Sequence, residues 1–521
     1  MTSAQGRMRP THPRAHRVDD IATAFGLRLV AAGGDPDTQV TGLAVGSDDL
    51  APGDLFVALR GLKRHGAEFT AQALAAGARA ILTDAEGAGL VGDEAGVPVL
   101  VAENPRELVG DLAAWMYGYP GHELVTVAVT GTNGKTTTAY FVDAAQRAHL
   151  GSTAVLGTVE LRVGEESIES PRTTVEAPVL HAILALARER GVRAATIEAS
   201  SHALALRRTG GLELDVAGFT NLQRDHLDFH GDMDTYLADK ARLFQEGQAS
   251  RGVVVVDDEW GEKMVGLATI PVETLTTRVG VPAAEEADWA VLEAQIGLDG
   301  VGSTFSLRTP DGSVVEAASP LPGLVNVSNA ALAVVLAHRS GVPLDVAIAA
   351  VGSAHAIPGR MERVIERGDG WPLCLVDYAH TPDALELALQ AVRPITPGRL
   401  IIVFGSDGDR DQGKRPIMGE VAARLADVLV VTDENPRSED PATIRAAILE
   451  GVRAVRPDGR EVEEVSPRAD AIRRALAIAE DTDTVIVTGK GHEPTQEIAG
   501  VFHRYNDRDV YLAVRAERTG A

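Results

Sequence analysis

The sequence predicts an α/β protein of three domains: a small N-terminal α/β domain, a central doubly wound domain and a C-terminal Rossmann-like α/β domain. The first observation is length, because 521 residues exceed a single domain of about 150 residues. The second is the alternation of apolar, strand-like runs with helical patterns, which a doubly wound parallel sheet requires. The third is one strand-like run that breaks into a glycine-rich turn before a helical pattern. We predict boundaries at 1–122, 123–355 and 356–521.

The composition argues against several classes of protein. A net charge of −25 without a basic stripe disfavours nucleic-acid binding. No segment approaches the ~18 uninterrupted apolar residues of a membrane span. The single cysteine, Cys374, lies in an apolar run and is expected to be a buried, inert thiol. We therefore expect a cytoplasmic, monomeric protein without a membrane span. The start of the chain is predicted to be disordered and not a signal peptide, because it has no apolar core around Arg7, Arg9, Arg14 and Arg17.

The two outer domains are predicted from short alternating elements. In the N-terminal domain these are strands at 55–59 and 79–83 and helices at 67–76 and 107–118, and a Tyr-Pro-Gly-His break at 119–122 ends the domain. This domain shows no catalytic group of residues. In the C-terminal domain the predicted strands are 373–377, 400–404, 428–432 and 484–487, the helices are 382–392, 416–426, 441–454 and 468–480, and charged loops follow at 405–415, 433–440 and 489–493.

The glycine-rich turn follows a predicted strand at 125–129 and opens a helical pattern. Its glycines let backbone N–H groups point inward, and the helix N-terminus adds positive potential, so the turn suits a phosphate, as in a P-loop. Its lysine can reach the β- and γ-phosphates, and the threonine after it can bind Mg²⁺. The strict P-loop pattern has a glycine where Val129 stands, and the alternative is a turn with a surface lysine. The predicted nucleotide-binding residues are Gly131, Thr132, Asn133, Gly134, Lys135, Thr136 and Thr137.

Polar residues follow other predicted strands of the central domain. A strand at 194–198 ends in Glu198, and a short strand at 219–222 ends near His226. Because ligands gather at the carboxyl ends of parallel strands, we expect these residues to converge on Thr136. Taken alone, Glu198 could be an exposed acid at a strand end and His226 a structural histidine. A predicted helix at 234–244 carries Lys240, which by pattern alone reads as a solvated surface charge.

Eight motifs in one order resemble the Mur ligase family from about residue 40 to 510: VTGTNGKTT (129–137), IEASSH (197–202), TNLQRDHLDFHGDMDTYLADK (220–240), NVSNA (326–330), VDYAHTPDALE (376–386), FGSDGDRDQGKRP (404–416), DENPRSEDP (433–441) and TGKGHE (488–493). The resemblance implies that the first domain holds a UDP moiety, the central one ATP, and the last an incoming amino acid. It implies an ATP- and Mg²⁺-dependent ligase that adds meso-diaminopimelate to UDP-N-acetylmuramoyl-L-alanyl-D-glutamate through an acyl phosphate.

The resemblance also assigns roles within the central site. Thr136, Glu198, His226 and Lys240 correspond to metal-binding positions, and Lys135 is grouped with the last three as catalytic. Lys240 corresponds to a lysine that is carbamylated (N6-carboxylysine), and because carbamylation needs the neutral amine, we predict a lowered pKa. By analogy, Asn326 and Asn329 contact adenine, although they could also be an N-cap and its neighbour. Arg360 and Asp377 correspond to contributions of the last domain to ATP binding, which makes domain closure part of assembling the site.

The substrate positions follow the family pattern with departures. Those that grip the muramoyl dipeptide correspond to Thr173, Thr174, Ser200 and Arg208, but Val175 stands where proline is common and Leu206 where a glutamine often sits. Ser47 corresponds to a uridine-site serine, yet Asp48 replaces the arginine that usually follows it.

The incoming amino acid is predicted from the segment Glu434, Asn435, Pro436 and Arg437. A guanidinium can clamp the second carboxylate of meso-diaminopimelate, which L-lysine lacks, and Arg437 suits that role. In the family, diaminopimelate-adding members carry Asp-Asn-Pro-Arg, so Glu434 is a conservative departure. The resemblance assigns Arg410 to the other carboxylate, and Glu493 with the Gly489 backbone to the distal ammonium. A second Glu-Asn-Pro-Arg at 103–106 lacks flanking motifs and is predicted to be a helix-start turn.

Other functions remain open at this point. The same ligase could add L-lysine or another diamino acid. A folylpolyglutamate-type ligase would share the phosphate loop, but the clamp and the separate first domain argue against it. A nucleotide-dependent binding module would need neither an amino-acid clamp nor a metal-binding Lys240.

Overall fold

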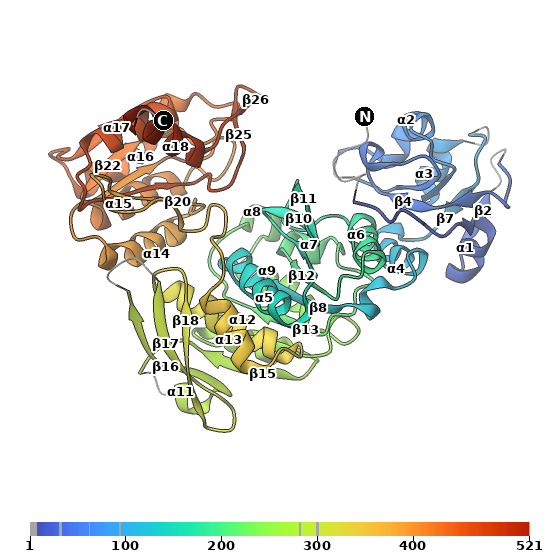
Figure 1. Cartoon of the computed structure of the whole chain (residues 1–521). Coiled ribbons are helices and arrows are strands. Elements are labelled where there is room, and N and C mark those ends of the chain that lie inside the picture. The colour runs from blue at the N-terminus through green and yellow to red at the C-terminus, as the bar shows by residue number, and fades with distance from the viewer. Residues whose placement is uncertain are drawn as a thin grey trace. The chain divides into compact units, whose positions relative to one another are not determined.

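The computed structural model describes residues 8–30, 34–61, 63–92, 95–280, 283–297 and 302–519. The chain forms two compact units (Figure 1). The first comprises Met1–Thr276, Glu285–Trp289 and Leu332–Ala350, and the second Thr277–Ala284, Ala290–Ala331 and Val351–Ala521. Among the described residues, no helix combines the length and apolarity needed to cross a lipid bilayer. The predicted N-terminal domain and most of the predicted central domain fall in the first unit, and the division into three domains stays a prediction.

The first unit begins with a five-stranded sheet of order β2-β7-β6-β5-β4. The predicted strands at 55–59 and 79–83 are confirmed as β5 and β6, and the Glu-Asn-Pro-Arg at 103–106 starts α4 as predicted. The bounds are β2 (Arg28–Val30), β4 (Gly42–Ala44), β5 (Asp54–Ala58), β6 (Ala80–Thr83), β7 (Val99–Val101), α1 (Val18–Phe25), η2 (Ser47–Asp49), η3 (Gly66–Phe69), α2 (Thr70–Ala75), α3 (Ala85–Val91), α4 (Pro105–Met116) and η4 (Pro120–Glu123).

The prediction of a disordered start is wrong for residues 8–17. Met8 is fully buried, and the Arg9 guanidinium donates to both carboxylate oxygens of the buried Asp54 at 2.9 and 2.7 Å. Two further residues form β1 (His16–Arg17), which pairs with β3 (Gln39–Val40). The order comes from contacts with residues more than twenty positions away, which composition cannot show. Residues 1–7, with Arg7, lie outside the described residues.

The large sheet of the first unit runs in the order β11-β10-β9-β12-β8-β13-β14-β15. Strands β9, β12, β8, β13, β14 and β15 are parallel, and α5 lies against β8, β9 and β12 (Figure 1). The bounds are β8 (Val125–Thr130), β9 (Thr153–Leu156), β10 (Glu160–Val163), β11 (Glu166–Glu169), β12 (Ala194–Glu198), β13 (Val216–Phe219), β14 (Gly252–Val255), β15 (Val272–Thr276), α5 (Lys135–Leu150), α6 (Ala177–Glu189), α7 (Ser201–Ala205), α8 (Leu227–His230), α9 (Met233–Ala241), η5 (Arg242–Phe244) and α10 (Glu259–Leu267).

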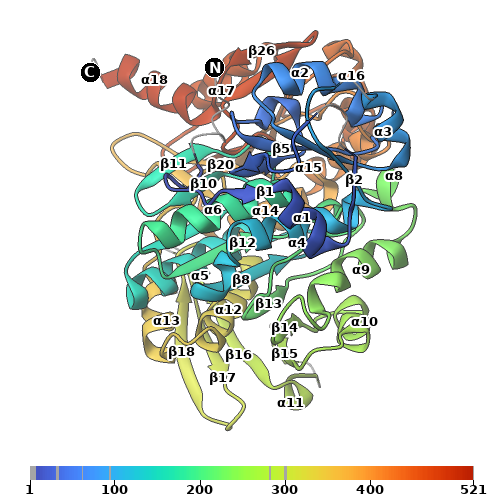
Figure 2. The same cartoon turned by 90° about the vertical axis from the view of Figure 1, so that its right-hand side faces the viewer.

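Two details of the predicted central domain are wrong. The strand placed at 219–222 ends at Phe219, because Thr220 and Asn221 use their polar groups on the glycine loop: Thr220 Oγ1 donates to Asn133 O at 2.7 Å. The alternation of strands and helices stops at an antiparallel ribbon of β16 (Trp289–Ile296), β17 (Ser303–Arg308) and β18 (Val314–Ser319), most of which belongs to the second unit (Figure 2).

The main sheet of the second unit has the order β19-β20-β24-β21-β22-β23, and β20, β24, β21, β22 and β23 are parallel. The predicted strands at 373–377 and 400–404 and the helix at 382–392 are confirmed without a shift. The bounds are β19 (Glu362–Ile365), β20 (Leu373–Asp377), β21 (Leu400–Phe404), β22 (Val428–Val431), β23 (Val462–Glu464), β24 (Thr484–Thr488), β25 (Thr495–Ile498), β26 (Val501–Arg504), α14 (Pro382–Val392), η6 (Arg393–Ile395), α15 (Lys414–Leu425), α16 (Pro441–Val455), α17 (Arg468–Ile478) and α18 (Asp507–Thr519). The helices α11 (Ala283–Glu286), α12 (Leu324–Arg339) and α13 (Leu344–Gly352) have residues in both units.

A fully buried ion pair joins distant segments of the second unit. The Arg468 guanidinium, at the start of α17, donates two hydrogen bonds of 2.8 Å to Asp507 at the start of α18. It also donates to the backbone oxygen of Thr488, the last residue of β24, at 2.8 Å and to that of Asp433, just after β22, at 3.3 Å. Its four hydrogen bonds therefore join α17 to three other segments, the start of α18 and the ends of β24 and β22.

Replacing Arg468 by methionine is expected to lower the free energy of unfolding by about 3–5 kcal/mol, because Asp507 would remain buried as an unpaired charge. Urea unfolding followed by circular dichroism measures this change. The matched control is Arg473→Met, which removes a guanidinium from the same helix, α17. Arg473 forms an exposed ion pair with Glu517 of α18, so its loss should change stability little. Equal losses in the two variants would contradict the assignment.

Candidate active site

The glycine loop between β8 and α5 is shaped by its two glycines. Gly131 and Gly134 have φ values of 147° and 86°, where side chains are disfavoured, and a Cβ on Gly131 would overlap Thr220 Oγ1. The loop is held from outside by Asn221, whose side-chain oxygen accepts from Asn133 N at 3.0 Å. The predicted turn is therefore confirmed, and it opens the N-terminus of the sixteen-residue helix α5.

Positive charge gathers on this loop. Lys135 Nζ donates to the backbone oxygens of Gly131 at 2.9 Å and Thr132 at 2.8 Å, so its ammonium lies over the loop. The backbone N–H groups and dipole of α5 point to the same place. An anion bound here would meet a lysine and a helix N-terminus together.

Glu198 lies directly beside the loop. Its carboxylate is fully buried and accepts hydrogen bonds from Thr136 Oγ1 at 2.9 Å, Thr158 Oγ1 at 2.9 Å and Thr158 N at 2.8 Å. Parallel pairing of β12 with β8 sets Glu198 opposite Val129, immediately before the loop begins. The alternative of an exposed acid at a strand end is wrong, and the expected convergence of Glu198 with Thr136 is present.

Lys240 is buried and not a surface charge. Only 1% of its surface is exposed, and its Nζ donates to Gly131 O at 2.8 Å, the same oxygen that Lys135 contacts. The Nζ also lies 4.5 Å from the centre of the Tyr236 ring. Burial, and then the positive charge of Lys135, hold the pKa of Lys240 well below its usual range. The predicted lowering of the pKa is confirmed in direction.

His226 stands in the left-handed region with φ 53° and completes this neighbourhood. Its Nε2 lies 3.4 Å from Asp225 Oδ2, and its ring is 4.8 Å from that of His202. Its side chain is 47% exposed, yet the desolvation of the ring lowers its pKa to about 4, and the charges of His202, Lys135 and Lys240 act in the same direction. The imidazole is therefore neutral near pH 7, as a metal ligand must be.

Sequence reasoning missed a chain of hydrogen bonds behind these residues. His230 Nδ1 lies 2.9 Å from Asp239 Oδ2, and His230 Nε2 lies 2.9 Å from Ser201 Oγ. The three side chains resemble a Ser-His-Asp hydrolytic triad, but the serine is only 2% exposed and no substrate can reach it. They instead join α7 to α9. The sequence around Ser201, His230 and Asp239 gives no sign of this contact, because the contact depends on tertiary packing.

The donor set around the loop fits a hard cation. The described residues contain no cluster of three or more His, Cys, Asp or Glu side chains suited to a metal. A hydroxyl, Thr136, and a carboxylate, Glu198, are nevertheless adjacent oxygen donors, and phosphate oxygens and water commonly supply the rest of a Mg²⁺ shell. A carbamate on Lys240 would add a second anionic oxygen ligand.

The residues predicted to grip the muramoyl dipeptide lie around the same strand end. Thr174 Oγ1 donates to Glu198 O at 2.7 Å and accepts from Ser200 N at 3.0 Å. Thr173 Oγ1 lies 3.1 Å from Thr158 Oγ1 and, since the Thr158 proton goes to Glu198, is the donor of this pair. The guanidinium of Arg208 donates to Thr174 O at 3.3 Å and lies 2.8 Å from Glu176. Ser47 lies apart from them in η2, partly exposed.

The residues predicted to contact the nucleotide from outside the loop belong to the second unit. Asn326 and Asn329 lie inside α12, joined by a 3.1 Å hydrogen bond, so the alternative that they are an N-cap and its neighbour is wrong. Their contact with adenine stays a prediction. Asp377 accepts from Met361 N at 2.8 Å and Ala379 N at 2.9 Å. The Arg360 guanidinium lies 4.3 Å from the centre of the Tyr378 ring. Domain closure stays a prediction.

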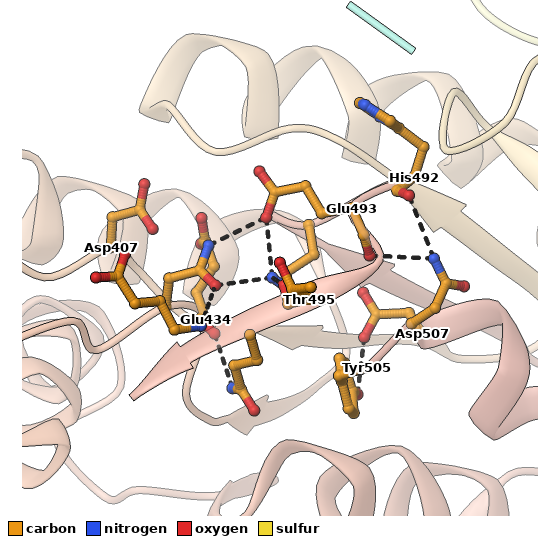
Figure 3. Close-up of polar contacts among 12 residues, drawn as sticks. Asp407, Glu434, His492, Glu493, Thr495, Tyr505 and Asp507 are labelled. Atoms are coloured by element: carbon orange, nitrogen blue, oxygen red, sulfur yellow. Dashed lines mark hydrogen bonds and ion pairs between the residues drawn. The ribbon is translucent and has the colours of Figure 1, made fainter. Parts of the chain in front are cut away.

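The predicted amino-acid site lies at the carboxyl ends of β21, β22 and β24 in the second unit (Figure 3). The buried Lys490 donates to Asn435 Oδ1 at 2.8 Å, Glu493 Oε2 at 2.9 Å and Thr495 O at 2.7 Å. Asn435 Nδ2 donates to the same oxygen of Glu493 at 3.1 Å. Sequence reasoning missed Lys490, although it stands inside the TGKGHE motif.

The predicted clamp lies in the same region. Arg437 Nη2 is 3.5 Å from Asp407 Oδ2, and its Nη1 is 3.9 Å from Glu497 Oε2. Gly489 has φ 111°, and a Cβ there would lie 2.5 Å from Glu434 Oε2. Arg410 is exposed on the loop after β21.

Three family models match this chain: "Mur ligase family, catalytic domain" at 39–117, "Mur ligase middle domain" at 129–337 and "Mur ligase, glutamate ligase domain" at 359–491. A UDP-N-acetylmuramoyl-L-alanyl-D-glutamate--2,6-diaminopimelate ligase of Streptomyces coelicolor is 44% identical, covering 97% of each chain. A UDP-N-acetylmuramyl-tripeptide synthetase of Leifsonia xyli is 46% identical, covering 98% of each. A solved structure titled as the 2,6-diaminopimelate ligase has TM-score 0.62 and 32% identity, covering 93% of this chain and 96% of its own. The chain belongs to the Mur ligase family.

Proposed function

We propose that this Mur ligase uses ATP to join meso-diaminopimelate to UDP-N-acetylmuramoyl-L-alanyl-D-glutamate. The observation that carries the proposal is the meeting of Lys135, Thr136, Glu198 and Lys240 at one glycine loop. The names of relatives such as the Streptomyces ligase support the substrates.

The chemistry explains this arrangement. A carboxylate and an amine do not condense spontaneously in water, so the γ-phosphoryl group is first transferred to a carboxylate oxygen of the substrate, and ADP leaves. The amine then attacks the carbonyl carbon, and phosphate leaves with the bonding electron pair. Both reactants of the first step are anions that repel one another, so the protein supplies positioning and positive charge. Lys135 and the N-terminus of α5 would hold the nucleotide phosphates.

Thr136, Glu198, His226 and Lys240 would hold Mg²⁺. The ion supplies positive charge that offsets the repulsion between the phosphate and the carboxylate. Lys240 takes part as a carbamate: its neutral amine attacks CO₂, an N–C bond forms and a proton leaves. Burial beside Lys135 favours the neutral amine that this step needs.

The amino acid added is proposed from Arg437, whose guanidinium would hold the distal carboxylate of meso-diaminopimelate. L-lysine or another diamino acid is the alternative, and the Leifsonia relative is named only as a tripeptide synthetase.

The test measures ADP release with the UDP-muramoyl dipeptide and a panel of amines. We expect release that depends on both the dipeptide and meso-diaminopimelate. Turnover without any amine would indicate a nucleotide-dependent binding module, and indifference to both substrates would indicate a folylpolyglutamate-type ligase.

Replacing Arg437 by alanine is expected to raise the KM for meso-diaminopimelate by about 10- to 100-fold, since a charged hydrogen bond to a carboxylate is lost. Steady-state kinetics should show little change in the KM for L-lysine, which has no distal carboxylate. Arg453→Ala, on the exposed surface of α16, removes the same charge and serves as the control. The same loss with every amine would disprove the clamp.

A further inference from the structure

Two carboxyl groups follow neighbouring strands of the second unit. Asp407 and Glu434 each stand three residues after the paired positions Phe404 and Val431 of β21 and β22, so they emerge at the same edge of the sheet. Figure 3 shows the two side chains close together. Among the described residues, Asp407 Oδ1 and Glu434 Oε2 are both buried and lack a hydrogen-bond partner. Glu434 is only 2% exposed.

This pair is electrostatically incomplete. Burial and the neighbouring charge of Asp407 raise the pKa of Glu434 to about 8. A buried, unsatisfied carboxyl oxygen is unfavourable, and two of them side by side would be stabilised by a cation that donates to both. A primary ammonium has three donors and suits such a place.

The neighbouring cations in the described part of the chain leave Asp407 Oδ1 and Glu434 Oε2 without a partner. Arg437 faces the other oxygen of Asp407, Oδ2, at 3.5 Å, and Lys414 Nζ donates to His380 O at 2.9 Å. Lys490 has all three donors occupied by Asn435, Glu493 and Thr495. The Arg468 guanidinium is directed to Asp507 and to backbone oxygens. Glu493 Oε2 is therefore already paired with Lys490 of its own chain.

We propose that Asp407, together with Glu434, accepts the side-chain ammonium of the incoming diamino acid. This inference rests on the proposed function and names the residue that determines its amine specificity. Arg437 Nη2 lies 3.5 Å from Asp407 Oδ2, so a subsite for a carboxylate adjoins the subsite for an ammonium. That pairing matches the distal carbon of meso-diaminopimelate, which carries both groups. On binding, the distal carboxylate of the substrate would pair with the Arg437 guanidinium, and its distal ammonium would pair with Asp407. The net charge of the site would therefore stay balanced.

The test compares meso-diaminopimelate with 2-aminopimelate, which keeps the attacking amine and the distal carboxylate but lacks the distal ammonium. In Asp407→Asn, the preference for meso-diaminopimelate, as a ratio of kcat/KM values, should fall about 10- to 100-fold, the effect of losing one charged hydrogen bond. The change should lie in KM for the amine, with the KM values for ATP and the UDP-dipeptide unchanged. Glu434→Gln, a second isosteric variant, should shift the ratio in the same direction.

The matched control is Asp409→Asn, which neutralises a carboxylate of the same loop that contacts Ser438. It should leave the ratio unchanged. An unchanged ratio in both Asp407→Asn and Glu434→Gln, or an equal loss with both amines, would overturn the inference. If the wild-type protein joins no diamino acid to the UDP-dipeptide, it is the proposed function that fails.

Discussion

Replacing Lys240 by methionine is expected to lower the rate of ADP release by about 100- to 1,000-fold, the effect of removing one charge-stabilising group from a water-excluded site. Methionine fills a similar volume, so the buried position beside Tyr236 stays packed. What it lacks is an amine that can become a carbamate. The loss should therefore appear in kcat with little change in thermal stability.

The measurement has a second readout that does not depend on activity. Wild-type protein incubated with isotopically labelled bicarbonate should show a carbamate carbon by NMR, and Lys240→Met should not. Lys263→Met is the control, because this lysine lies exposed on α10, 4.0 Å from the centre of the Trp260 ring. A carbamate signal that survives in Lys240→Met, or full activity in that variant, would refute the assignment.

Replacing Glu198 by glutamine is expected to lower kcat by about 100- to 1,000-fold and to raise the Mg²⁺ concentration needed for half-maximal rate. The shape of the side chain is retained, but a negative oxygen donor is replaced by an amide. The hydroxyls of Thr136 and Thr158 can reorient toward the amide, so the fold should persist.

A magnesium titration of ADP release measures this effect. Glu160→Gln provides a control that should behave like wild type. Glu160 lies on β10, which β9 separates from β12, and its carboxylate accepts a hydrogen bond from Tyr140. If Glu198→Gln responded to Mg²⁺ as the wild type does, Glu198 would not be a metal ligand.

Local pattern was enough to predict the parts of this protein that depend on neighbouring residues. The glycine loop, the strand that ends in Glu198 and the exact limits of β20 and β21 all follow from spacing and residue type. Tertiary burial was not predictable in this way. Lys240 lies on a helix with a polar pattern, and only the loop and Tyr236, packed over it, make it a buried amine.

The errors have the same origin. The helix α12 begins at Leu324, two residues before Asn326, so the alternative that Asn326 and Asn329 are an N-cap and its neighbour is wrong. Asp407 was not singled out, since its significance comes from Glu434 on the next strand and not from its own motif. The contact of Lys490 with Glu493, three residues later, was likewise not predicted, because it depends on how the loop folds back on itself.

The bridge from Ser201 through His230 to Asp239 has a mechanical consequence. Ser201 directly follows Ser200, the N-cap of α7, and Asp239 directly precedes Lys240 on α9. Two side-chain hydrogen bonds of 2.9 Å to His230 therefore join these helices. A displacement of α7 or α9 is therefore transmitted to the other helix through the His230 imidazole. The proposed dipeptide-binding residue Ser200 and the proposed metal ligand Lys240 are thereby coupled, so that a shift of one helix would move both.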